Sequence, residues 1–414
     1  MTNRDARFIP LDGLRGAGIV LVVLAHARLI WLLETAPVHG WETWLLRIVD
    51  FNWIAMEAFF AMSGFLVTGI LLRTRSDARF FRNFYARRVL RIFPLYYGFL
   101  GFYLLLLPRL MDLTANPETA YPYVSEHQAW YWSYTANFLI ARHGAWLGEM
   151  SHFWSLSVEE HFYLLWPLVI YFLSGRSILR LSAAAIVIST ALRAYLTWGV
   201  ELPTVSVYVM TITRLDSILM GSMLAVLADV RVDASPLLRL RPALTGLSAI
   251  FAPVLVWMYA REGHFSALGE AARTQQQGHL YPSVTVLGYL MVGIMCSALM
   301  VWLLTGTERN WLVRLFSLRP LRTLGQYSYG IYIVHFLVLG MFHQSSLSML
   351  RLSEAFGSRA LGLLAGFTMQ FLVTFALAWL VWHGCEKHFL ALKRHFERDA
   401  GAAAARVPTA AVST

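Results

Sequence analysis

The chain has 414 residues, of which 57% are hydrophobic and only 14% are charged. A soluble protein of this length would carry far more charge, so the composition excludes an ordinary soluble enzyme. The net charge of +10 would suit a nucleic-acid partner, but basic residues also gather in the cytoplasmic loops of membrane proteins. We prefer the second explanation and expect no nucleic acid. The two cysteines, Cys296 and Cys385, lie in or beside apolar stretches and predict no disulfide framework.

Apolar runs long enough to cross a bilayer recur along the chain. They predict an all-α, polytopic membrane protein with about ten transmembrane helices, near residues 12–33, 50–72, 88–108, 157–174, 178–198, 204–228, 242–260, 282–305, 323–346 and 360–384. Most basic residues fall in the segments that share a side with the N-terminus, which predicts that both termini are cytoplasmic. We expect the protein to lie in the inner (cytoplasmic) membrane. We expect one transmembrane domain over residues 1–397. The alanine-rich residues 398–414 predict a disordered tail.

His26 and Arg15 lie in the first predicted span at an interval of eleven residues. At about 100° per residue this interval puts both on one face of a helix, with the imidazole deep in the bilayer. Ionisable residues are costly in hydrocarbon and usually serve function there. Arg15 could simply pair with Asp12 or reach the headgroups, and His26 could be a structural hydrogen-bonding group between helices. The alternative is that His26 is a general base or a proton relay.

Seven arginines lie between residues 73 and 91. Arg88 and Arg91 share a helical face, and guanidinium groups bind phosphate in a bidentate manner. At a cytoplasmic surface this cluster predicts a binding site for a polyphosphorylated ligand. Topology and anionic lipid headgroups would explain most of the seven arginines, but they do not require the pair at 88 and 91.

Adjacent glutamates, Glu159 and Glu160, begin a predicted span at the outer face. One of them can stabilise the N-terminus of the helix, which leaves the other pointing into the bundle. Glu160 and Tyr163 share a face, and a carboxylate there could orient a histidine or hold an acceptor hydroxyl. The preceding segment, residues 109–156, is rich in tryptophan and tyrosine. It predicts either an interfacial aromatic belt with short helices or a platform for a sugar ring.

Arg214 and Asp216 lie within the predicted span 204–228. Residues two apart do not face each other on a helix, so each needs a partner elsewhere. That partner could belong to an interhelical ion pair or to a substrate, and the sequence leaves both interpretations open. Polar groups around His335 in the ninth predicted span favour structural hydrogen bonding.

Five motifs together resemble the integral-membrane acyltransferase family three, and they extend from about residue 8 to residue 390. In chain order they are Leu11-Asp12-Gly13-Leu14-Arg15-Gly16 followed by His26, Phe59-Phe60-Ala61-Met62-Ser63-Gly64-Phe65-Leu66, Arg87-Arg88-Val89-Leu90-Arg91-Ile92-Phe93-Pro94, Trp154-Ser155-Leu156-Ser157-Val158-Glu159-Glu160 through Pro167, and Tyr327-Ser328-Tyr329-Gly330-Ile331-Tyr332 with His335. One departure is His161, where the family often has glutamine.

The resemblance implies a transferase that moves an acyl group, usually acetyl, from cytoplasmic acyl-CoA to a hydroxyl of a cell-surface or exported glycan or a related metabolite. Acyl-CoA would be a co-substrate, and we expect no permanently bound cofactor and no metal. The residues matching the family's motifs then receive roles. Arg15, Arg88 and Arg91 would bind the coenzyme, His26 would be the base or carry the acyl group, and Glu160 would orient it. Further candidates for substrate contact are Asp12, Glu159, Tyr163, Arg214 and Asp216.

The main rival is a proton-coupled transporter or a flippase of a glycan or lipid-linked substrate, since buried histidine and arginine also suit that function. Transporters often contain internal repeats with helices broken at corresponding positions. No internal repeat is apparent in this sequence, so we favour the enzyme.

Overall fold

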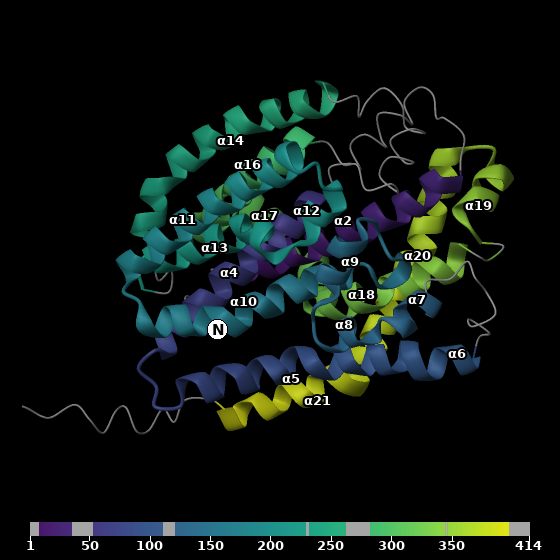
Figure 1. The fold of residues 1–414 in the computed structure, drawn as a ribbon, viewed down its shortest axis with the longest axis horizontal. Helices are drawn as coiled ribbons and strands as arrows, with labels where there is room; N and C mark the ends of the chain where they lie inside the picture. The colour runs from purple at the N-terminus through teal and green to yellow at the C-terminus, as the bar shows by residue number, and fades with distance from the viewer. Residues whose placement is uncertain are drawn as a thin grey trace, which may run out of the picture.

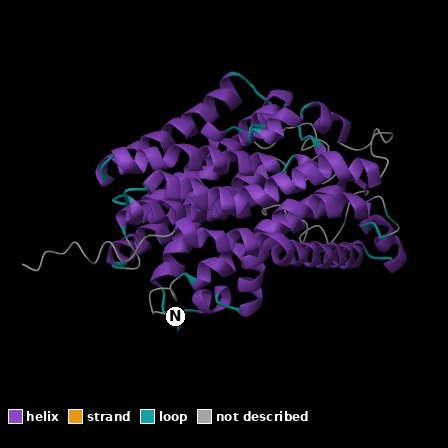
Figure 2. Cartoon of the chain, turned by 90° about the horizontal axis from the view of Figure 1, so that it is seen from below, coloured by secondary structure: helices purple, strands orange, loops and turns teal. Residues whose placement is uncertain are grey.

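The computed structural model describes residues 8–34, 53–110, 121–228, 232–261, 282–343, 345 and 347–396. Nearly all of these residues are helical, and none within these ranges is in a strand (Figure 2). The predicted all-α class is therefore confirmed. The predicted disordered tail, residues 398–414, lies outside the described residues.

Seven helices of the described ranges are long and apolar enough to cross a membrane. They are Ile9–Ala27, Ile54–Thr74, Phe80–Leu110, Gly175–Gly199, Ser235–Arg261, Val284–Thr305 and Arg359–Phe396. Each coincides with one of the ten predicted spans. Two more predicted spans fall in long helices that carry more polar residues, α10 (Phe153–Phe172) and α18 (Arg319–His343). A multi-span membrane protein is therefore supported, while the number of ten and the orientation of the termini stay predictions.

The predicted continuous span over residues 204–228 is wrong. The structure divides it into α12 (Thr204–Val209), a 3-10 turn (Thr211–Arg214) and α13 (Leu215–Leu227). The hydroxyl of Thr213 donates to the carbonyl oxygens of Val207 and Met210, at 2.6 and 2.7 Å, and so satisfies backbone groups at the break. The 13 residues of α13 extend only about 20 Å, less than the roughly 30 Å of a hydrocarbon core.

The longer helices lie side by side and run in roughly one direction, with α14 at one edge and α5 beside α21 at the opposite edge (Figure 1). Their bounds are α2 Ile9–Glu34, α4 Ile54–Thr74, α5 Phe80–Gly101, α11 Gly175–Ala194, α14 Ser235–Arg261, α16 Tyr289–Thr305, α17 Trp311–Phe316, α19 Met349–Phe356, α20 Arg359–Val381 and α21 Lys387–Ala391. Five-residue π-helical segments continue α5, α11 and α20 and precede α16; the one after α20 is Trp382–Glu386. Such segments are frequent at functional sites.

The aromatic segment before α10 folds into three short helices, α7 (Tyr121–Glu126), α8 (Gln128–Trp132) and α9 (Ala136–His143). Tyr131 and Tyr134 are buried in the core, and Trp132 stacks on Tyr97 with ring centroids 5.6 Å apart. Short helices were expected here. The burial of these rings means that part of the aromatic content serves packing.

Glycines allow α2 and α18 to approach until their backbones touch. A Cβ atom added at Gly16 would collide with the carbonyl oxygen of Leu321, and one added at Gly325 would collide with that of Asp12. Small residues permit such close contacts between membrane helices. The contact fixes the register of the two helices, and it therefore determines which polar side chains of α2 and α18 meet.

We expect Gly325→Ala to lower the free energy of unfolding by roughly 1–3 kcal/mol, because the added methyl group forces α2 away from α18. Chemical denaturation of the purified protein in detergent measures this change. The matched control is Gly98→Ala, where an added Cβ atom has no neighbour within 4 Å. Equal stability of the two variants would show that the backbone contact is unimportant.

Candidate active site

Three histidines from three separate elements meet inside the bundle: His26 of α2, His152 immediately before α10, and His335 of α18. Nδ1 of His26 lies 3.0 Å from Nε2 of His335. The rings of His152 and His335 have centroids 4.9 Å apart, and the ring of Phe336 contacts both His26 and His152 at 4.4 and 5.0 Å. His152 and His335 are buried, whereas His26 is partly exposed. The predicted base therefore has two imidazole neighbours.

Tyr332 connects this cluster to α10. Its hydroxyl donates to the carbonyl oxygen of His152 at 2.7 Å and lies 2.5 Å from Oγ of Ser155. Its own carbonyl oxygen lies 2.7 Å from Nδ1 of His335. One tyrosine thus holds the segment that carries His152 against the helix that carries His335.

A cavity of about 140 Å³, which we call the inner cavity, reaches Ser155 and Tyr332. Its lining mixes polar and apolar side chains: Arg15, Ile19, Met56, Phe59, Met62, Ser63, Leu66, Arg88, Ser155, Leu156, Glu159, Tyr163, Ser328, Tyr329 and Tyr332. Four of the predicted site residues are among them, namely Arg15, Arg88, Glu159 and Tyr163. A cavity of this composition can hold a partly polar chain.

The predicted residues of the inner cavity also contact one another. The guanidinium carbon of Arg88 lies 4.2 Å from the ring centroid of Tyr163, a cation–π distance. The hydroxyl of Tyr163 donates to Oε2 of Glu159 at 3.0 Å and forms a second hydrogen bond with Ser63. The contacts hold a cation and a carboxylate on one wall of the cavity.

Glu160 lies elsewhere. It does not line the inner cavity, and its Oε1 atom is buried without a hydrogen-bond partner. It follows His152 by eight residues along α10, or about 12 Å of helix. The only hydrogen bond of the His26 side chain within the described residues goes to His335. No contact in the described part of the chain therefore supports the prediction that Glu160 orients His26. The hydrogen-bond partner of Nδ1 of His26 is His335.

A second cavity of about 480 Å³, the arginine cavity, lies at the start of α18. Its lining carries four arginines and one aspartate: Asp12, Arg15, Arg91, Arg319, Arg322, Thr323, Gly325, Gln326 and Trp382. The predicted residues Asp12, Arg15 and Arg91 meet here, and Arg15 also lines the inner cavity. Nε of Arg322 is buried without a partner. An excess of guanidinium groups with unused donors suits a phosphorylated ligand.

Sequence reasoning missed three residues of the arginine cavity, Arg319, Arg322 and Trp382. The two arginines lie in a predicted cytoplasmic segment and were attributed to topology alone. The structure shows that the start of α18 and the π-helical segment after α20 bring all three next to Arg15. No pattern within one segment could have revealed this meeting of three helices.

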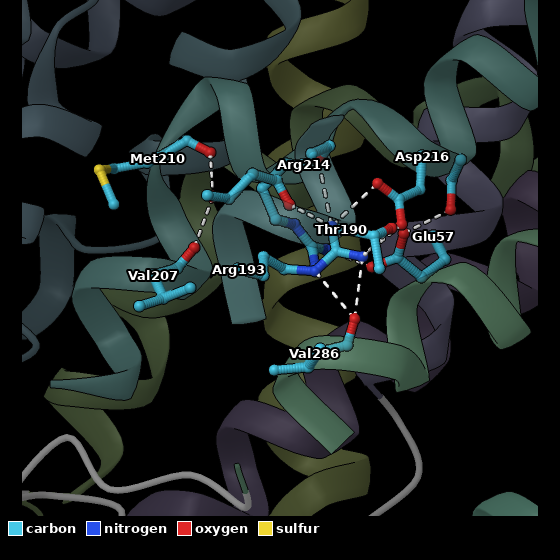
Figure 3. A network of polar contacts seen from close by, with 11 residues as sticks. Glu57, Thr190, Arg193, Val207, Met210, Arg214, Asp216 and Val286 are labelled. Carbon is cyan, nitrogen blue, oxygen red and sulfur yellow. Dashed lines mark hydrogen bonds and ion pairs between the residues drawn. The ribbon is translucent and has the colours of Figure 1, made fainter. Parts of the chain in front are cut away.

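Arg214 and Asp216 lie in a separate buried network (Figure 3). Arg193 donates to both oxygens of Asp216, at 2.9 and 2.6 Å. Arg214 forms an ion pair with Glu57, and the hydroxyl of Ser217 donates to Glu57 at 2.5 Å. None of these residues lines either cavity. Of the two interpretations, the contacts favour interhelical ion pairs over a substrate contact.

The family model described as an acyltransferase domain matches residues 9–383. One relative is YrhL of Bacillus subtilis, which is named a putative peptidoglycan O-acetyltransferase. It is 25% identical over 346 residues, which cover 80% of this chain and 49% of that protein. Staphylococcus aureus O-acetyltransferase OatA is 26% identical over 349 residues, which cover 80% of this chain and 51% of that protein. The chain thus spans about half the length of these curated relatives. No solved structure matches it. The match over nearly its whole length shows that the chain belongs to the acyltransferase 3 family.

Proposed function

We propose that the protein is an O-acyltransferase of the inner membrane. It takes an acyl group, with acetyl as the first candidate, from acyl-CoA on the cytoplasmic side and transfers it to a hydroxyl of a glycan or related metabolite. The observation that carries this proposal is the position of Arg15, which lines both the arginine cavity and the inner cavity. Through Arg15, a cavity lined by four arginines adjoins the inner cavity, whose lining includes Tyr332. Tyr332 in turn is hydrogen-bonded to His152 and His335.

The arginine cavity suits the nucleotide end of the donor. Coenzyme A carries a pyrophosphate and a 3′-phosphate, and four guanidinium groups surround this space. The ring of Trp382 in the same lining offers a stacking surface for adenine. The pantetheine arm would then enter the inner cavity past Arg88 and Tyr163 and bring the thioester toward Tyr332.

His26 would act on the acceptor. Its Nε2 atom takes the proton of the acceptor hydroxyl while the hydroxyl oxygen attacks the thioester carbonyl carbon. The carbon–sulfur bond breaks, and the coenzyme leaves as a thiol with the proton returned by the imidazolium. Alternatively, Nε2 itself attacks the thioester carbonyl carbon, the carbon–sulfur bond breaks and the coenzyme leaves as a thiolate. The acceptor hydroxyl then attacks the acyl-imidazole, the carbon–nitrogen bond breaks and the hydroxyl proton goes to the thiolate. In both routes the chemistry needs a free nitrogen on His26.

The acceptor class follows from the relatives. YrhL is named for peptidoglycan and OatA for O-acetyl transfer. We therefore place a hydroxyl of a peptidoglycan-like or other surface glycan first among the acceptors.

Kinetics with radiolabelled acetyl-CoA and peptidoglycan fragments test the proposal in the purified protein in nanodiscs. We expect Arg15→Ala to raise KM for acetyl-CoA by roughly 10–100-fold, because each lost charge-assisted hydrogen bond is worth about 1.5–3 kcal/mol. The control is Arg180→Ala, an exposed arginine that lines neither cavity. A wild-type protein that transfers no acetyl group from acetyl-CoA, or an unchanged KM in the Arg15 variant, would contradict the proposal.

A further inference from the structure

The hydrogen bond between His335 and Tyr332 determines which nitrogen of His335 carries its proton. Nδ1 of His335 lies 2.7 Å from the backbone carbonyl oxygen of Tyr332. A carbonyl oxygen can only accept a hydrogen bond, so Nδ1 must be the donor. In the neutral ring Nε2 is then unprotonated and can only accept.

The same logic extends to His26. Nε2 of His335 lies 3.0 Å from Nδ1 of His26. Since that Nε2 accepts, Nδ1 of His26 carries the hydrogen. A neutral imidazole has one hydrogen on nitrogen, so Nε2 of His26 keeps a free lone pair.

We propose that His335 is a positioning residue that holds His26 in the tautomer with an unprotonated Nε2. The carbonyl group of Tyr332 keeps the proton of His335 on Nδ1. The unprotonated Nε2 of His335 then keeps the proton of His26 on Nδ1. This inference rests on the proposed function, in which Nε2 of His26 receives the proton of the acceptor hydroxyl or attacks the thioester. It assigns to His335 the role that is often filled by a carboxylate beside a catalytic histidine.

The neighbouring histidine, His152, does not compete for the hydrogen bond between His335 and His26. His152 is the other imidazole beside His335, and its Nδ1 donates to the carbonyl oxygen of Glu149 at 2.9 Å. Its Nε2 is therefore unprotonated and can only accept, and within the described residues no donor reaches that buried atom. His152 has no ring N–H left with which to compete for Nε2 of His335.

Packing fixes the geometry. His335 is fully buried, and the ring of Phe336 lies 4.4 Å from that of His26 with an interplanar angle of 48°. The hydroxyl of Tyr332 donates to the carbonyl oxygen of His152, and the backbone of Tyr332 belongs to α18. The carbonyl group that accepts from His335 is therefore held in place.

Two substitutions of His335 separate its two hydrogen bonds. His335→Asn keeps an amide near the Nδ1 position but removes the acceptor for His26, whereas His335→Gln can place an amide oxygen near the Nε2 position. We expect His335→Asn to lower kcat by roughly 10²–10⁴-fold with KM for acetyl-CoA unchanged. His335→Gln should recover a large part of that loss. The control, His161→Asn, alters a histidine that bonds to Thr211, outside the cluster.

Nitrogen-15 NMR of the histidine-labelled protein reads the tautomer without any activity. The expected wild-type spectrum shows His26 protonated on Nδ1 and unprotonated on Nε2, and His335→Asn removes that preference while His335→Gln preserves it. Equal kcat values for the Asn and Gln variants, or a wild-type His26 protonated on Nε2, would overturn the inference. If wild-type acetyl transfer were absent while the NMR result held, the proposed function would fail and the tautomer relay would stand.

Discussion

His26→Gln is expected to lower kcat for acetyl transfer by roughly 10²–10⁴-fold, the usual contribution of a general base, and to leave KM for acetyl-CoA unchanged. The substitution keeps a polar side chain of similar size that can still bond to His335. It removes the titratable nitrogen that accepts the acceptor's proton. We expect KM to stay unchanged because the phosphates of the coenzyme would be held by the arginine cavity, which His26 does not line.

The matched control for this prediction is His161→Gln. His161 is also partly exposed and hydrogen-bonded within the bundle, to Thr211 at 2.7 Å, but it lies outside the histidine cluster. We expect it to retain wild-type kcat and His26→Gln to insert and fold normally. A His26→Gln protein with wild-type kcat would remove His26 from the chemistry and return the cluster to a structural role.

The second large effect concerns stability. Glu57→Gln is expected to lower the free energy of unfolding by about 3–5 kcal/mol, because it removes the direct ion-pair partner of the buried guanidinium of Arg214. Glu57 is 1% exposed and Arg214 is 2% exposed. Only one nitrogen of Arg214 has a hydrogen-bond partner, and that partner is Glu57. Four aromatic rings also lie around this guanidinium group, the nearest being Tyr289 at 4.0 Å.

Denaturation in detergent measures this loss, with the exposed Glu308→Gln as the control. The double variant Glu57→Gln/Arg214→Gln removes both charges and should be more stable than the sum of the single effects implies. If instead Arg214 contacts substrate, Glu57→Gln would change KM for the acceptor with little loss of stability. That outcome would reverse our preference for an ion pair.

The sequence predicts a span well where the hydropathy of one continuous segment is enough to determine it. Seven apolar runs became helices because twenty or so apolar residues have one low-energy arrangement in lipid. The prediction of a continuous span over residues 204–228 failed because the helix break depends on one hydrogen bond, from the hydroxyl of Thr213 to the carbonyl oxygen of Val207. The mean hydropathy of some twenty residues hardly changes when one of them carries a hydroxyl group.

The candidate site was predictable only in part, for a related reason. A buried histidine and clustered arginines stand out within a single segment, so His26, Arg15 and Arg91 could be singled out. His335 lies 309 residues from His26, and no spacing rule reaches that far. The glycine contact between α2 and α18 is what brings them together, and it belongs to the tertiary structure.

Acetyl transfer in membrane vesicles of known orientation measures whether acyl-CoA bound in the arginine cavity on the cytoplasmic side reacts with a hydroxyl beside His26. Acetyl-CoA does not cross the bilayer, so the donor can be supplied to one face at a time. We expect glycan O-acetylation when acetyl-CoA reaches the cytoplasmic face, and loss of that signal in His26→Gln. Transfer with donor supplied only to the opposite face, or equal transfer by His26→Gln, would contradict this expectation.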